Sequence, residues 1–201
     1  MLFRSLVVVV PNYRLNPQVT YPAYLDDAAA AVAWTHQHIA EHGGNPQRLF
    51  VSGHSAGGYL TLMIGMDPHY LEAVGVPTTA IAGLIPVSGQ TVTHFTVRKE
   101  RGIGFYTILC DDAAPLRWVR ADLPPMLVIY ADHDMTYRTE ENALLVKALQ
   151  GIKHPDVEGL MVLDRDHGTV ASKLVEDGDP GRVALLKFVA EHPRTPEPAA
   201  P

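Results

Sequence analysis

The chain of 201 residues has little cysteine, little positive charge and no long apolar run. Its single cysteine, Cys110, has no second thiol with which to form a disulfide or a zinc site. The 16 lysines and arginines are outnumbered by 22 aspartates and glutamates, and the net charge of −6 has the wrong sign for a nucleic-acid binder. We therefore expect neither a disulfide scaffold nor a cysteine-based metal site, and no nucleic-acid partner.

The apolar run nearest the N-terminus covers only residues 6–11, and no apolar run in the sequence is long. A membrane-spanning helix needs roughly 20 apolar residues, so the sequence predicts no membrane span. The run ends directly in Asn12, Tyr13 and Arg14, where a secretory signal would carry small residues. The cytoplasm is the default location, and it is left open because a signal peptide could have preceded the printed start.

What the chain does contain is typical of a globular α/β domain, with 47% hydrophobic and 19% charged residues. Segments rich in β-branched and apolar residues alternate with segments of helical period, which predicts a mostly parallel sheet with helices on both faces. The four valines at 7–10 predict a strand buried on both faces. Further strands are expected at 48–52, 81–87, 126–130 and 159–163, and helices at 22–42, 56–66, 139–149 and 180–192.

Two segments depart from this alternation. Residues 89–122 mix threonine, histidine, arginine and aromatic residues without a period, and we interpret them as a cap-like insertion over the sheet edge. Residues 193–201 are rich in proline and alanine and are expected to form a disordered tail. The sequence thus predicts a single domain over 1–192.

The motif with chemical content is Gly53-His54-Ser55-Ala56-Gly57, which fits G-x-S-x-G between a predicted strand and a predicted helix. Such a turn holds the serine in a strained conformation above the strand ends, and the glycines at 53 and 57 are expected to relieve the crowding. Ser55 is the candidate nucleophile. The N–H of Ala56, at the start of the helix, is the candidate oxyanion donor.

A serine nucleophile needs a base and an orienting carboxylate. The strand at 126–130 is followed by Asp132, His133 and Asp134, and the strand at 159–163 is followed by His167. Because parallel strands end at one edge of a sheet, we expect His167 and Asp134 to lie near Ser55. Asp132 is the alternative candidate for the orienting acid, and His133 is the alternative candidate for the base.

The remaining polar and aromatic residues carry weaker hypotheses. His38 and His42 have a spacing that could bind a metal, but no third ligand is apparent, so we expect a solvated helix face and no metal or cofactor. His54 is expected to hydrogen-bond locally. Four aromatic residues of the cap-like segment are candidates for the substrate pocket: Phe95, Phe105, Tyr106 and Trp118.

Five segments together resemble the α/β-hydrolase superfamily: VVVVPNYRL, DDAAAAVAW, NPQR, GHSAGGYL and PPMLVIYADHD. Within it the chain is similar to esterases of the hormone-sensitive-lipase-like and bacterial feruloyl-esterase-like branches, and the histidine inside the elbow favours the feruloyl-esterase-like and arylformamidase-like branches. The resemblance implies a serine esterase acting on a small-molecule ester, with Ser55 as nucleophile, His167 as base and Asp134 as acid at the fourth position of G-x-x-D. Ala131 replaces the glycine of that motif, which keeps Asp132 open.

Members of this family carry an HGG oxyanion loop before the strand that corresponds to VVVVPNYRL, and no HGG precedes that segment in this sequence. This predicts an N-terminally truncated esterase domain whose sheet lacks an interior strand. The loss of one oxyanion donor typically lowers turnover by about 10² to 10³. The alternatives to an ester hydrolase are an arylformamidase or amide hydrolase with the same triad, and a catalytically impaired fragment. The acyl group, the alcohol and the oligomeric state stay open.

Overall fold

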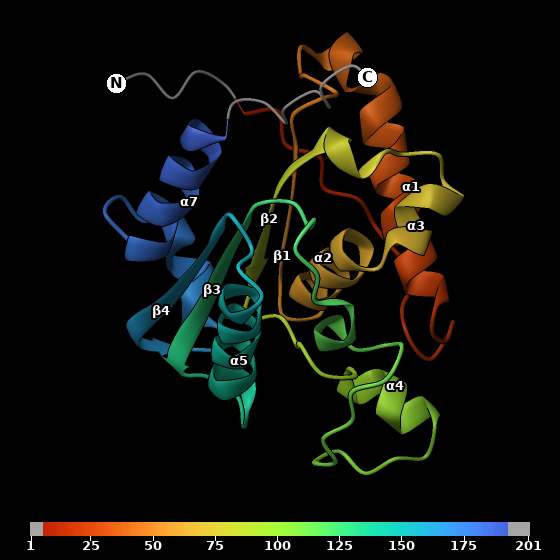
Figure 1. Ribbon diagram of the computed structural model, residues 1–201, viewed down its shortest axis with the longest axis vertical. Coiled ribbons are helices and arrows are strands. Elements are labelled where there is room, and N and C mark those ends of the chain that lie inside the picture. Colours follow the sequence, from red (N-terminus) through yellow and green to blue (C-terminus); the bar gives the residue numbers. More distant parts are fainter. Residues whose placement is uncertain (1–5, 193–201) are drawn as a thin grey trace.

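A computed structural model describes residues 6–192. Its centre is a four-stranded parallel sheet in the order β1-β2-β3-β4 (Figure 1). The strands are β1 Leu49–His54, β2 Ile81–Val87, β3 Met126–His133 and β4 Val157–Asp166. Each strand pairs in parallel with the next one along the chain, so all four end at the same edge. The predicted parallel α/β architecture is confirmed.

Helices cover both faces of the sheet, as predicted (Figure 1). Side chains alternate along β3: Met126 and Val128 pack toward one layer, while Leu127 and Ile129 pack toward the other. The first layer contains α1 Ala23–His38, α2 Ala56–Met66, α3 Pro68–Ala73 and α5 Arg138–Gly151, and the second contains α6 Thr169–Ser172 and α7 Pro180–Glu191.

The remaining elements are short. Helix α4 Phe95–Glu100 and the 3₁₀ turn Pro115–Trp118 lie in the long connection between β2 and β3, the segment interpreted as a cap-like insertion. Three other 3₁₀ turns cover Ile39–His42, Thr78–Ala80 and Lys173–Val175. Within the described part of the chain, no helix combines the length and the apolar character needed to cross a membrane.

Most predicted elements form: β2 and α2 have the predicted bounds, and the others differ at their ends. The helix predicted at 22–42 is α helical only to His38, and the strand predicted at 159–163 extends over all of β4. Asp179 begins α7 as predicted, because its carboxylate accepts the N–H groups of Gly181 and Arg182. The predicted tail at 193–201 lies outside the described residues.

The strand predicted at 7–10 is wrong. These residues form no strand, and Val8 and Val10 are 74% and 86% exposed. A run of valines supplies β propensity, but a strand also needs a hydrogen-bonded neighbour, and none of the four strands pairs with this segment. On the side away from β2, β1 has no strand partner among residues 6–192.

Helix α2 packs very closely on the residue that follows Ser88. A Cβ atom on Gly58 would lie 2.7 Å from the Cα atom of Gly89, so the two backbones are in direct contact. A Cβ atom on Gly57, one residue earlier, would meet nothing within 4 Å. Only glycine at 58 therefore permits this approach of α2 to the end of β2.

We expect Gly58→Ala to lower the free energy of unfolding by about 1–3 kcal/mol, because the added methyl group meets backbone and not a flexible side chain. Gly57→Ala is the matched control and should be neutral or stabilising by up to about 1 kcal/mol, as alanine favours helix. Urea denaturation of both variants measures the difference. Equal stabilities would contradict this account of the packing.

Candidate active site

Each of the four strands ends directly before a polar residue of one cluster. Ser55 follows β1, Ser88 follows β2, Asp134 follows β3 and His167 follows β4. The parallel pairing brings these four positions to the same edge, since His54 is in register with Val87 and His133 with Asp166. The sequence pointed to three of them and missed Ser88.

Ser55 occupies a strained turn between β1 and α2. Its φ of 57° and ψ of −113° are unusual for a residue with a side chain. Its N–H donates to the carbonyl of Val87, 2.9 Å away, which fixes the turn to β2. A Cβ atom on Gly53 would lie 2.5 Å from the carbonyl carbon of Gly57, so glycine is required at 53. The expectation that Gly57 also relieves crowding is wrong, because space is open there.

A chain of hydrogen bonds joins the three residues. The Oγ atom of Ser55 lies 2.7 Å from Nε2 of His167, and Nδ1 of His167 lies 2.6 Å from Oδ1 of Asp134. An ionised carboxylate only accepts hydrogen bonds, so Nδ1 carries the proton and donates it to Asp134. Nε2 is then free to accept the hydroxyl proton of Ser55. This is the geometry that a serine nucleophile and its base require.

Asp134 is buried and fully occupied by donors. Its carboxylate accepts from His167, from the Ser88 hydroxyl at 2.5 Å and from the Met135 N–H at 2.7 Å. Burial alone would raise the pKa of Asp134, but the bonds from His167, Ser88 and Met135 outweigh it, so the net pKa is lowered. Asp134 is therefore held as an anion at the position where it orients His167.

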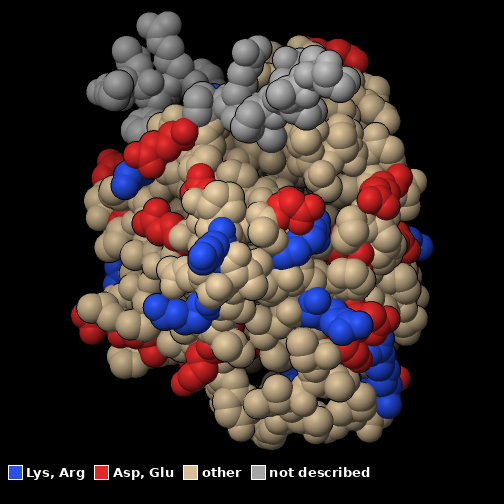
Figure 2. All heavy atoms as spheres, viewed as in Figure 1, with Lys and Arg blue, Asp and Glu red and all other residues tan. Residues whose placement is uncertain are grey.

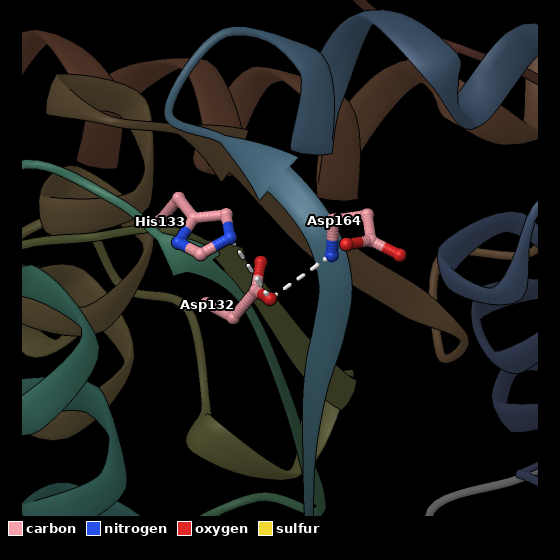
Figure 3. A group of neighbouring side chains, drawn as sticks. All are labelled: Asp132, His133 and Asp164. Carbon is pink, nitrogen blue, oxygen red and sulfur yellow. Dashed lines mark hydrogen bonds and ion pairs between the residues drawn. The ribbon is translucent and has the colours of Figure 1, made fainter.

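Asp132, the alternative acid, has other partners. One carboxylate oxygen accepts the N–H of Asp164 at 3.0 Å (Figure 3). The other accepts the N–H of Arg165, also at 3.0 Å. These bonds tie the end of β3 to the last residues of β4, just before His167. Asp132 thus fastens the turn that leads to His167 and does not touch the imidazole.

His133, the rival base, points toward Asp132, at 3.6 Å from its carboxylate (Figure 3). The atoms of Asp132, His133 and Asp164 that could bind a metal ion lie within 4.8 Å of one another. No other group of three such residues occurs in the described part of the chain. Both oxygens of Asp132 already accept backbone N–H groups. His38, considered above as a metal ligand, instead lies 3.2 Å from Glu41 and its ring packs against Trp34.

The expectation that His54 hydrogen-bonds locally is wrong. Its Nε2 donates to the carbonyl of His167, 2.7 Å away and 113 residues later in the chain, and the two rings lie 4.6 Å apart. Burial lowers the pKa of His54, which outweighs the opposing effect of the His167 carbonyl and favours the neutral ring. The residue before Ser55 thereby holds the backbone of the histidine that faces Ser55.

A buried polar network fixes the segment after β2. The Nε of Arg138 donates to Glu141 at 2.9 Å, and its Nη1 donates to the carbonyl of Ser88 at 2.5 Å. The second oxygen of Glu141 accepts the N–H groups of Thr91 and Val92. The first turns of α5 therefore hold residues 88–92 in place, and with them the hydroxyl that contacts Asp134.

A cavity of about 460 Å³ lies between this segment, α4 and α5. Three of the aromatic residues predicted for a substrate pocket line it: Phe95, Phe105 and Tyr106. Trp118, the fourth, does not line this cavity; it packs against the core and its Nε1 donates to the carbonyl of Asp112. The cavity also takes in Met135, which directly follows Asp134.

Comparisons with known proteins agree with this architecture. A family model described as alpha/beta hydrolase fold matches residues 4–103. A carboxylesterase of Mycobacterium tuberculosis, NlhH, is 30% identical over 147 residues, which cover 64% of this chain. A thermophilic esterase of Thermogutta terrifontis, Est2, superposes with a TM-score of 0.68 over 93% of this chain and 72% of its own, at 22% identity. The chain has the alpha/beta hydrolase fold.

The chain spans less than half the length of the curated relatives that it matches. Its match to NlhH covers 46% of that protein, and its match to a probable carboxylic ester hydrolase of M. tuberculosis, LipM, covers 39% at 26% identity. The likeness to Est2 shows the fold alone.

Ser88 has a testable effect on the electrostatics of this α/β-hydrolase. We expect Ser88→Ala to raise the pKa of Asp134, because the hydroxyl stabilises the charged carboxylate. Asp134 has a lowered pKa, so it stabilises the fold above its unfolded-state pKa, and this contribution disappears as the pH falls through its folded-state pKa. In the variant this contribution should be smaller, and its loss should be complete at a higher pH.

Carbon-13 NMR titration of the Asp134 carboxyl and acid unfolding measure this change. The control is Ser52→Ala in β1, whose hydroxyl donates to the Ile85 carbonyl and does not contact Asp134. At neutral pH, Ser88→Ala should cost about 1.5–3 kcal/mol, the usual range for a hydrogen bond to a charged group. An unchanged titration of Asp134 would show that Ser88 does not act on the carboxylate.

Proposed function

We propose that this α/β-hydrolase cleaves carboxylic esters through an acyl-enzyme formed on Ser55. The observation that carries the proposal is the hydrogen-bond chain from Ser55 to His167 to Asp134, at 2.7 and 2.6 Å. The names of the relatives, among them carboxylesterase NlhH and esterase LipC, support the same reaction class. The reaction uses only groups that the chain itself supplies.

In the first half of the reaction, Oγ of Ser55 attacks the ester carbonyl carbon while Nε2 of His167 takes the hydroxyl proton. The tetrahedral intermediate collapses, the bond to the alcohol oxygen breaks, and His167 gives its proton to the leaving alkoxide. In the second half, water attacks the acyl-enzyme, His167 takes its proton and returns it to Ser55, and the carboxylic acid leaves. Asp134 stays ionised throughout and stabilises the imidazolium.

The oxyanion needs a donor on the far side of the scissile carbonyl. Ala56 is the first residue of α2, and the first N–H groups of a helix have no partner within it. Its N–H therefore fits the role of a donor, aided by the positive end of the helix dipole. One such donor typically contributes about 10² to 10³ in turnover.

The cavity fits the apolar part of a substrate. Met135 follows Asp134 directly, and Gln90 follows Gly89, whose backbone touches Gly58 in α2. The cavity thus begins next to the residues that hold the triad. Phe95, Phe105 and Tyr106 give it an aromatic wall, which favours an acyl or alcohol group with apolar surface.

Ser55→Ala is expected to abolish hydrolysis of a short-chain aryl ester and labelling by a fluorophosphonate, since no other hydroxyl lies against His167 in residues 6–192. The loss should be at least about 10³-fold, with the fold retained. Ser52→Ala serves as control and should keep wild-type turnover. Activity that persists without the Ser55 hydroxyl would refute the acyl-enzyme. Aryl formamides in the same assay distinguish an ester hydrolase from a formamidase.

The two aspartates at the end of β3 should differ sharply in their effect on kcat. Asp134→Asn should lower kcat by about 10⁴, because an amide no longer fixes the tautomer and charge of His167. Asp132→Asn should cost less than about tenfold, since Asp132 contacts only backbone N–H groups and His133. Steady-state kinetics of the pair, with circular dichroism as a check on folding, test this. A larger loss from the Asp132 variant would reverse the roles.

A further inference from the structure

The cavity beside the triad has apolar walls and two buried arginines, Arg98 and Arg138. Val92, Ile108 and Leu144 line it together with the aromatic residues already described. Arg98, from α4, also lines the cavity and is only 4% exposed. Figure 2 shows a hollow at the lower edge of the molecule, above the loop that follows α4. A guanidinium in such surroundings is costly unless an anion or several acceptors meet it.

The guanidinium of Arg98 has a single hydrogen-bond partner among residues 6–192. Its Nη1 donates to the carbonyl of Thr107. Its Nε is buried and has no partner anywhere in the described chain. The Nε–H and one N–H of Nη2 lie on the same side of the planar guanidinium, where they match the two oxygens of a carboxylate.

Another arginine of the chain shows how Nε and Nη2 bind a neighbouring carboxylate. At Arg14, Nε donates to one oxygen of Asp27 at 2.9 Å and Nη2 donates to the other at 2.7 Å. At Arg98 no such acid is present: no carboxylate of residues 6–192 lies within ion-pair distance of its guanidinium. Burial lowers the pKa of Arg98, and the attraction of the Glu141 charge offsets this only in part.

The other charged groups at the cavity do not pair with the guanidinium of Arg98. Arg138 and Glu141 pair with each other at 2.9 Å, and Glu141 also accepts two backbone N–H groups. Glu140, the third, is on the exposed side of α5. Two acids beside the cavity disfavour a doubly charged ligand such as a phosphate monoester, whereas a single carboxylate matches the one unpaired cation.

We propose that Arg98 binds a carboxylate inside this cavity, so that the preferred substrates are esters carrying a free carboxylate on an apolar spacer, such as half-esters of dicarboxylic acids. This inference rests on the proposed function for the reaction at Ser55, but the binding itself does not require turnover. The apolar walls hold the spacer, Nε and Nη2 of Arg98 hold the carboxylate, and the ester end reaches Ser55 past Met135.

Binding is measured first in the Ser55→Ala protein, where hydrolysis does not interfere. The probes are monoethyl adipate and the neutral ester ethyl heptanoate, compared by isothermal titration at pH 7. We expect the half-ester to bind at least tenfold more tightly than the neutral ester. Equal or weaker binding of the half-ester would overturn the proposal without any substitution at Arg98.

Arg98→Gln, added to the same background, should remove this preference. Arg98→Lys keeps the charge but not the two-pronged geometry, so it should retain only part of it. The matched control is Arg101→Gln, because Arg101 follows α4, pairs with Asp111 and does not line the cavity. Thermal unfolding of each variant monitors the fold. A preference that survives Arg98→Gln in a folded protein would overturn the proposal.

In the protein with Ser55 intact, Arg98→Gln should raise KM for the half-ester at least tenfold, leave KM for the neutral ester unchanged and alter kcat little. A purely structural role for Arg98 would instead change both substrates together. If the half-ester binds through Arg98 but Ser55 never cleaves any ester, the carboxylate site stands and the proposed function fails. The two conclusions are thus separable.

Discussion

The site depends on one constraint: four parallel strands end at the same edge of the sheet, and each is followed at once by a side chain of the hydrogen-bond chain. Ser88 contacts Asp134, Asp134 contacts His167, and His167 contacts Ser55. None of these residues is near another in sequence. The backbone hydrogen bonds of the sheet hold these side chains close to one another. The hydrogen-bond chain is therefore as rigid as the core beneath it.

Burying the charges of this edge is costly, and the structure offsets the cost with donors. Asp134 receives three hydrogen bonds, which keep it ionised despite its burial. Arg138 and Glu141 satisfy each other and also hold the backbone from Ser88 to Val92. These groups fix positions more than they add stability, because a buried ion pair gains little over an apolar pair of the same shape. The result is a carboxylate and an imidazole with a single arrangement.

Arg98 differs from these buried charges, because its buried Nε has no hydrogen-bond partner among the described residues and the residue lines an apolar cavity. The segment between β2 and β3 therefore serves two purposes. Near β2 it carries Ser88 and belongs to the relay, whereas α4 and the loop after it form the wall against which a substrate would lie. In the proposed reaction, the residue that supports Asp134 and the residues that select the substrate thus come from different parts of this segment.

The sequence by itself determined the local features. G-x-S-x-G between a strand and a helix located Ser55, because that turn is set by a few neighbouring residues, and the strand order placed His167 and an aspartate at the same edge. Only the tertiary structure separated Asp134 from Asp132, since the choice depends on which carboxylate reaches an imidazole 33 residues away. Only the tertiary structure also shows that the valines at 7–10 are exposed, that Ser88 contacts Asp134 and that Nε of Arg98 has no partner among the described residues. Propensity and spacing act along the chain, whereas hydrogen-bond partners and burial are decided by residues that meet only after folding.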